Sequence, residues 1–461
     1  MLFNDAMRYI CRWAALFVAF TLLAGAADRI KLPKTIPAKR LDALLYTFNG
    51  GDKDLILDFI KTNYSPNALL QRRPEDRAAT YLRLRANTGG FDLKQVIEST
   101  DHTITVLVQA RKTEEWYHII CPVDLASPHD LVGVIFKLVP RPEEFGGGRR
   151  YTDEEVAAEL ERYLSKLAAE HMFSGVVIVS RLPEKCPDDA KCEPQTIFQK
   201  AVTPAGVKPP FDLDTHFGLA SINKTFTAVA IAQLQQKKEV GFLDPITKYL
   251  PEFPKPRGER ITIHQLLTHT AGLEQFLSGE AFAEMQRAKI VTVGDLSRFF
   301  GSRPAVATPG EKFIYSNADY MLLQAIVQVV SGDSLEEYMR QHIYGPAGMK
   351  ATHAGSSTAP DMIRFGAALL SNELLPPDAT KFLMSPKVPT DDPETSYAYG
   401  LENEMVNGTR VVGHAGGGPN VSDQFDMYPE QRYIMVVLST QDDAAQHVAN
   451  KVREMLCAGK N

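Results

Sequence analysis

The stretch SINKTFTAVAIAQLQQKKEVG, residues 221–241, places the strongest constraint on what this chain can fold into. Its apolar residues surround most of a helix circumference, which is the pattern of a helix buried on all sides. Such a helix needs a large core around it, and a chain of 461 residues, 44% of them hydrophobic, can provide one. We expect the helix to begin at Ser221 and to stop at Gly241.

The polar residues of this helix gather in its first turn, where Ser221 and Lys224 are three positions apart and can touch. Burial and the positive end of the helix dipole both lower the pKa of a lysine at this place. A neutral lysine beside a serine hydroxyl is a general base beside its nucleophile. The pattern S-x-x-K is loose, however, and alone it fits a structural helix cap better than a catalyst.

A second motif, Y-x-N, lies in TPGEKFIYSNADYMLLQAIVQVVSG between a Pro-Gly turn and an apolar helix. As ordinary structure, Asn317 would cap the helix and Tyr315 would pack against its neighbours. As functional groups, the phenol and the amide would face Lys224 and Ser221. The phenol could then act as a base in one step and as an acid in the next.

The sequence His-Ala-Gly occurs twice. His353 follows a turn-rich stretch, and we expect it to be a surface histidine. His414 and Gly416 directly follow a strand-like run, and a glycine-bearing strand edge lets a substrate backbone approach closely. We therefore take His414 as the functional histidine.

Residues 1–27 have the pattern of a secretory signal peptide. Arg8 and Arg12 precede an apolar run that ends in small residues, and Ala24 and Ala26 fit an A-x-A cleavage site. The run is shorter than the ~20 residues that span a bilayer. We expect cleavage, export to the periplasm or the medium, and no stable membrane insertion; an uncleaved anchor is the alternative.

Charge and cysteine spacing limit the partners. The net charge is −6 without a long basic run, so nucleic acid is not an expected partner. Cys186 and Cys192 bracket a short polar loop that a disulfide could close after export, although two free thiols are nearly as plausible. No cysteine or histidine has metal-ligand spacing, H-E-x-x-H and G-x-S-x-G are both absent, and we expect no metal and no other cofactor.

The rest of the chain divides into two predicted domains. Residues 28–140 begin with helical stretches and end with strand-like runs, which favours a small α+β domain that loosely resembles the NTF2-like domains. Residues 141–150, RPEEFGGGRR, look like a linker. In residues 151–461, strand-like runs lie near both ends and helices lie between them, so we expect one sheet with a helical insertion.

The order Ser-x-x-Lys, Tyr-x-Asn, His-x-Gly resembles that of the serine β-lactamase and penicillin-binding-protein family, most closely its class C β-lactamase-like branch. The flanking stretches LDPITKYLPEFP, ITIHQLLTHTAGL and YGPAGM resemble the same branch. The likeness covers roughly residues 155–457. It implies an α/β sandwich with a five-stranded antiparallel sheet and an all-helical insertion, with the active site between them.

The resemblance also implies roles for single residues. Ser221 would be the nucleophile, Lys224 its base partner and Tyr315 the general base and acid. Substrate would contact Asn317, His414 and Gly416, while the backbone N–H groups of Ser221 and Gly417 would form the oxyanion hole. In β-lactamases a lysine usually stands where this chain has His414, which argues against β-lactam hydrolysis.

We therefore expect a serine hydrolase that cleaves an amide or an ester through an acyl-serine intermediate. Its substrate would be a small molecule or a peptide: an ester, a D-amino-acid amide or a peptidoglycan-like peptide. A β-lactamase is one alternative. The other is a catalytically idle penicillin- or peptidoglycan-binding protein, although such a protein would not need all three motifs.

Overall fold

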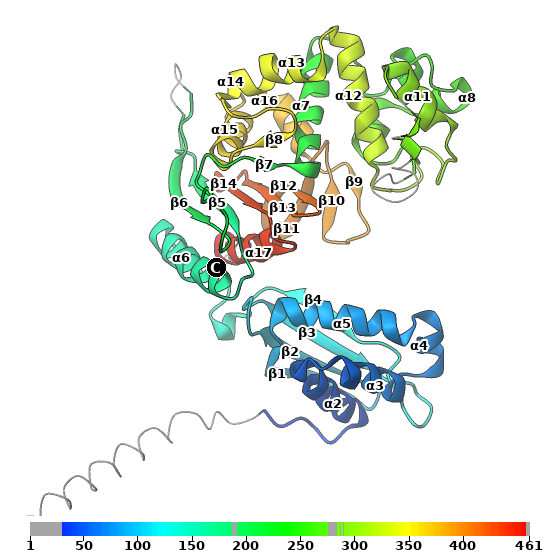
Figure 1. Ribbon diagram of the computed structural model, residues 1–461, viewed down its shortest axis with the longest axis vertical. Coiled ribbons are helices and arrows are strands. Elements are labelled where there is room, and N and C mark those ends of the chain that lie inside the picture. Colours follow the sequence, from blue (N-terminus) through cyan, green and yellow to red (C-terminus); the bar gives the residue numbers. More distant parts are fainter. Residues whose placement is uncertain (1–29, 187–190, 275–283, 286, 289, 458–461) are drawn as a thin grey trace, which may run out of the picture. The chain divides into compact units, whose positions relative to one another are not determined.

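The computed structural model describes residues 30–186, 191–274, 284–285, 287–288 and 290–457. The predicted signal peptide, residues 1–27, lies outside these ranges. The chain forms two compact units, one up to Pro140 and one from Arg141 onward (Figure 1). Within the described residues, no helix is both long enough and apolar enough to cross a membrane.

The described part of the first unit consists of helices followed by an antiparallel sheet in the order β1-β2-β3-β4. The elements are α2 (Ile36–Gly50), α3 (Lys53–Asn63), α4 (Pro66–Gln71), α5 (Pro74–Thr88), β1 (Phe91–Ser99), β2 (Thr103–Ala110), β3 (Trp116–Pro122) and β4 (Ile135–Val139). The helices pack on one face of the sheet, where Leu41 and Phe48 share a core with Ile104 and Ile119. Sequence analysis did not identify α4, α5 or β1.

The segment predicted as a linker, residues 141–150, contains a 3₁₀ turn, η1 (Glu143–Phe145). Arg141 lies at its start, and the Arg141 guanidinium is 3.4 Å from the Glu454 carboxylate near the C-terminal end of the chain. The start of this segment is therefore anchored to the second unit.

The second unit is built on an antiparallel sheet, whose described strands run in the order β6-β5-β14-β13-β12-β11-β10-β9. The strands are β5 (Gly175–Arg181), β6 (Gln195–Val202), β9 (Val388–Pro389), β10 (Thr395–Tyr397), β11 (Glu402–Val406), β12 (Thr409–Gly418), β13 (Val421–Tyr428) and β14 (Tyr433–Ser439). Gly175 pairs with Ser439, so the sheet joins both ends of the unit, as predicted. The predicted number of five strands is wrong, because the short strands β9, β10 and β11 extend the sheet beyond β12.

Helices cover both faces of this sheet (Figure 1). The helical elements are α6 (Asp153–Ala169), η2 (Ala220–Ile222), α7 (Asn223–Gln236), η3 (Ile246–Lys248), α8 (Lys255–Gly258), α9 (Ile263–Leu267), α11 (Val293–Ser302), α12 (Asn317–Ser331), α13 (Leu335–Met339), η4 (Arg340–Tyr344), α14 (Gly345–Ala347), α15 (Ala359–Leu370), α16 (Pro377–Met384) and α17 (Ala444–Leu456). Side chains alternate along the strands: Val177 and Val437 pack with α6 and α17, whereas Ile178 and Val436 pack with α7 and α15. A small two-stranded sheet, β7 (Phe217–Gly218) with β8 (Ser356–Ser357), precedes η2.

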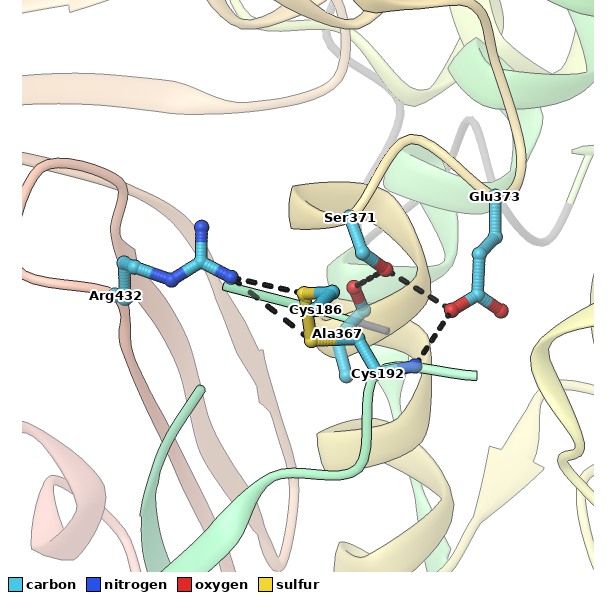
Figure 2. The surroundings of a disulfide bond; sticks show 6 residues. All are labelled: Cys186, Cys192, Ala367, Ser371, Glu373 and Arg432. Carbon is cyan, nitrogen blue, oxygen red and sulfur yellow. Dashed lines mark hydrogen bonds between the residues drawn. A yellow bond between two sulfur atoms is a disulfide. The ribbon is translucent and has the colours of Figure 1, made fainter. Parts of the chain in front are cut away.

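A disulfide joins Cys186 to Cys192 and closes the loop between β5 and β6 (Figure 2). The Cys192 N–H donates to the Glu373 carboxylate over 3.3 Å, and Ser371 Oγ donates to the same carboxylate oxygen over 3.0 Å. On the other side, the Arg432 guanidinium lies 3.1 Å from the Cys186 sulfur. The disulfide thus attaches the loop to the end of α15 and to the turn before β14.

Candidate active site

Ser221 lies in the short 3₁₀ turn η2, directly before α7, and is partly exposed. The preceding residue, Ala220, has a φ of +41°, a left-handed conformation that residues with a Cβ rarely adopt. Such strain is typical of functional sites, where the surrounding structure holds it in place. The predicted helix bounds need correction at both ends: α7 begins at Asn223, and it ends at Gln236 because Lys238 takes a left-handed φ of +62°.

Lys224 lies in the first turn of α7 and is buried, with 6% of its surface exposed. Its Nζ is 3.0 Å from Ser221 Oγ, and it donates a hydrogen bond to Asn317 Oδ1 over 2.6 Å. Burial lowers the pKa of Lys224 to about 8, a shift that a negative charge on the nearby Asp319 would oppose. Much of the lysine can therefore be neutral at mildly alkaline pH, as a general base must be.

Tyr315 lies in the loop immediately before α12, and its ring is 4.8 Å from Lys224 Nζ. Burial raises the pKa of Tyr315, a hydrogen bond with Ser221 lowers it in part, and the charge of Glu402 raises it further. The phenol therefore keeps its proton near neutral pH. Among the predicted roles of Tyr315, this geometry supports proton relay and proton donation better than the role of a resting base.

His414 lies on β12, and only 2% of its surface is exposed. Its Nδ1 lies 2.7 Å from the Ala415 carbonyl and its Nε2 lies 3.0 Å from the Tyr397 hydroxyl, so both ring nitrogens have internal partners. Burial lowers the pKa of His414 to about 4, and the charge of Lys224 lowers it further. The ring is therefore buried and uncharged near neutral pH, and its contact with substrate stays a prediction.

Gly416 and Gly417 bring β12 beside the turn that carries Ser221. A Cβ on Gly416 would lie 2.7 Å from the Leu219 carbonyl oxygen, which is too close, so this position requires glycine. A Cβ on Gly417 would meet nothing within 4 Å, and Gly417 is exposed. The Gly417 N–H remains the predicted partner of the Ser221 N–H in an oxyanion hole.

The family model described as beta-lactamase matches residues 195–356, the span that contains Ser221, Lys224, Tyr315 and Asn317. This match, together with the relatives described below, supports the serine β-lactamase and penicillin-binding-protein-like family. This confirms the predicted family and fold class. The more specific prediction, the class C branch, stays a prediction.

Three relatives illustrate the likeness to this family. A penicillin-binding protein of Bacillus subtilis (strain 168) is 26% identical over 52% of this chain, and the alignment spans 64% of that relative, a little under two thirds of its length. The crystal structure of a penicillin-binding protein from Bacillus halodurans is 25% identical, with a TM-score of 0.53 over 63% of this chain and 99% of that one. A D-amino acid amidase from Ochrobactrum anthropi SV3 shares the fold at 20% identity, with a TM-score of 0.53 over 66% of this chain and 97% of its own.

The other His-Ala-Gly sequence lies apart from this cluster of polar side chains. His353 is exposed in a turn before β8, and its ring lies 5.3 Å from that of His216. The turn that contains His353 nevertheless holds the segment around Ser221 in place, because the Gly355 carbonyl accepts hydrogen bonds from the Leu219 N–H and the Asn223 amide.

Sequence analysis missed three buried polar residues near the serine: His269, Asp319 and Tyr397. His269 Nδ1 lies 3.0 Å from Asp319 Oδ2, and the rings of Tyr315 and Tyr397 lie 4.4 and 4.9 Å from the His269 ring. One signal was visible in the sequence: Asp319 interrupts the apolar face of the helix that begins at Asn317. The described residues contain no group of three or more histidine, cysteine and acidic side chains that could hold a metal.

Proposed function

We propose that this protein is a serine hydrolase that cleaves an amide or an ester through an acyl-serine intermediate, with Ser221 as the nucleophile. One observation carries the proposal: the Nζ of the buried Lys224 lies 3.0 Å from Ser221 Oγ. The pKa of Lys224, lowered to about 8, allows a neutral amine to take the serine proton. Relatives in the same family support this assignment.

The remaining groups fit the steps of acyl transfer. In acylation, Lys224 Nζ takes the proton from Ser221 Oγ as that oxygen attacks the substrate carbonyl carbon. The backbone N–H groups of Ser221 and Gly417 would stabilise the oxyanion. Tyr315 donates its proton to the leaving nitrogen or oxygen and regains one from Lys224. Water then attacks the acyl ester and releases the acid and free Ser221.

The substrate class we favour is a D-amino-acid amide, a D-residue peptide or an ester. The uncharged His414 supports this choice, because it offers no positive charge to the carboxylate of a β-lactam at neutral pH. The D-amino acid amidase with the same fold is compatible with it. The penicillin-binding relatives keep β-lactam turnover, and penicillin or peptidoglycan binding without turnover, as the alternatives.

A labelling experiment combined with a substrate screen tests the proposal. The protein would be treated with a fluorophosphonate and a fluorescent penicillin, then assayed with a p-nitrophenyl ester, a D-amino-acid amide and a chromogenic cephalosporin. We expect labelling at Ser221, loss of labelling in Ser221→Ala, and turnover of the ester or the amide. Labelling of another serine in Ser221→Ala would contradict the assignment of Ser221 as the nucleophile. Labelling of the unmodified protein without turnover of any substrate would identify a binding protein.

We also propose that the protein is exported. The signal-like pattern of residues 1–27 supports this, as does the Cys186–Cys192 disulfide, because such bonds persist in oxidising compartments. Cell fractionation with mass spectrometry of the mature N-terminus tests it. Full-length protein that begins at Met1 and stays in the cytosol would contradict it.

A further inference from the structure

His269 holds the chain on both sides of Tyr315. It is fully buried, and its carbonyl oxygen accepts the Ile314 N–H over 2.8 Å. Its ring Nδ1 accepts the Ser316 N–H over 3.2 Å. Between these two bonds, the His269 ring packs on the Tyr315 ring, with centroids 4.4 Å apart. The position of the Tyr315 phenol therefore depends on one histidine.

The hydrogen-bond pattern defines the protonation of Asp319, the third residue of α12. Its Oδ2 lies 3.0 Å from the same Nδ1, and 1% of its surface is exposed. A ring nitrogen that accepts the Ser316 N–H carries no hydrogen of its own. The hydrogen between Nδ1 and Oδ2 must therefore belong to the Asp319 carboxyl group.

Both assignments leave Asp319 Oδ1 and His269 Nε2 without a hydrogen-bond partner in the described structure, but the opposite assignment also places a charge on Asp319. If Nδ1 carried the hydrogen and Asp319 were ionised, the buried Ser316 N–H would face another donor. The carboxylate would also carry a buried Oδ1 without a hydrogen-bond partner, at a high cost for a charged group. Burial itself raises the pKa of Asp319 well above its usual range and lowers that of His269.

We propose that Asp319 is a neutral hydrogen-bond donor to His269, and that this uncharged pair positions Tyr315 while leaving Lys224 without an anionic partner. The inference rests on the proposed hydrolase function, because it explains how Lys224 becomes a base. An ionised Asp319 would favour the protonated lysine. The charges that influence the pKa of Asp319 are those of Lys224 and Arg257, and the charges that influence the pKa of His269 are those of Lys224 and His414. Within the described structure, none of these three residues forms an ion pair with Asp319.

The chain contains a matched control in Asp361. It is the third residue of α15, as Asp319 is of α12, and is equally buried at 1% exposure. Asp361 accepts hydrogen bonds from the Ala351 N–H, the Thr352 hydroxyl and the Arg364 guanidinium. All of these partners are donors, so Asp361 serves as a hydrogen-bond acceptor where Asp319 serves as a donor.

Three variants separate the two roles. Asn can donate a hydrogen bond but never carries a charge, so Asp319→Asn should keep kcat within about threefold, whereas Asp319→Leu should lose at least about tenfold in kcat with little change in KM. The unfolding temperature should fall by less than about 2 °C in Asp319→Asn and by about 4 °C or more in Asp361→Asn. An Asp319→Asn variant as impaired as Asp319→Leu overturns the proposal. The proposal is also overturned if the acid limb of the kcat/KM profile of Asp319→Asn shifts to lower pH. That shift would mean that Asp319 carries a negative charge in the unmodified protein.

A second readout does not depend on activity. Nitrogen-15 chemical shifts of the histidine rings, with His269 assigned through His269→Gln, should show a proton on Nε2 and none on Nδ1, unchanged from pH 5 to pH 9. A proton on Nδ1 or a charged ring would refute the neutral pair. A protein that shows the expected ring state but hydrolyses nothing would instead refute the proposed function.

Discussion

At the scale of single residues, the site depends on keeping buried groups uncharged. Lys224 is buried beside Ser221 and Tyr315, and burial destabilises its cation. His414 is also buried, with its ring centroid 6.3 Å from that of Tyr315, and it hydrogen-bonds to a tyrosine and a carbonyl. Burial therefore prepares the base and also removes the charge that a surface histidine would carry at mildly acidic pH.

Lys224→Arg should lower kcat/KM by at least about 100-fold, nearly as much as Lys224→Ala, because arginine does not deprotonate in a protein. In the unmodified protein, kcat/KM should rise with pH through about 8, since the lysine is active only after it loses its proton. Stopped assays across pH 6–10 measure both effects. If the Arg variant stays within about tenfold of the parent, the base lies elsewhere.

Protonation of His414 should not affect the pH dependence of substrate preference near pH 6.5. Because its pKa is lowered to about 4, it stays neutral from pH 5.5 to pH 7.5. The ratio of kcat/KM for a carboxylate-bearing ester to that for a matched uncharged ester should be flat over this range, with His414→Gln as the control. A preference for the carboxylate that grows below pH 6.5 and disappears in His414→Gln would show that the ring is accessible after all.

At the scale of elements, the active site forms where a turn, a helix and a strand edge meet. The period of α7 predicted that Ser221 and Lys224 lie together, since one turn of a helix is a local structure. The place of Asn317 beside Lys224 was implied by the resemblance to the family. The 3₁₀ turn at Ser221 and the His269–Asp319 contact were not predictable, because both depend on residues distant in sequence. The strands β9 and β10 were also missed, being too short to show alternation.

Gly416→Ala tests the contact between β12 and η2. The added methyl group would lie 2.7 Å from the Leu219 carbonyl oxygen, so the turn that holds Ser221 must shift, and kcat should fall by at least about tenfold. The matched control is Gly418→Ala on the same strand, where a Cβ meets nothing within 4 Å and activity should stay within about twofold. Equal activity of the two variants would mean that β12 can move away without cost.

At the scale of the whole molecule, the functional groups all come from the second unit. Within the described residues the first unit has its own core and its own sheet. The side chains described around Ser221 belong to the second unit.

A protein that begins at Arg141 should fold and keep kcat within about threefold of the full chain, because the boundary between the two units lies at Pro140. Arg141 should be retained, since its guanidinium contacts Glu454. Circular dichroism, thermal unfolding and ester hydrolysis compare the two proteins. An aggregated or inactive truncation would show that the first unit completes the fold of the second.

The pairing of β5 with β14 sets an order for folding during synthesis. The first unit is complete once residue 140 has left the ribosome or an export channel, so it can fold while the rest is still being made. The second unit cannot close its sheet until Ser439 is available to pair with Gly175. Contacts so far apart in sequence form slowly. The nucleophile thus emerges long before the strand that completes its surroundings, and we expect the nascent chain to be inactive until Ser439 has emerged.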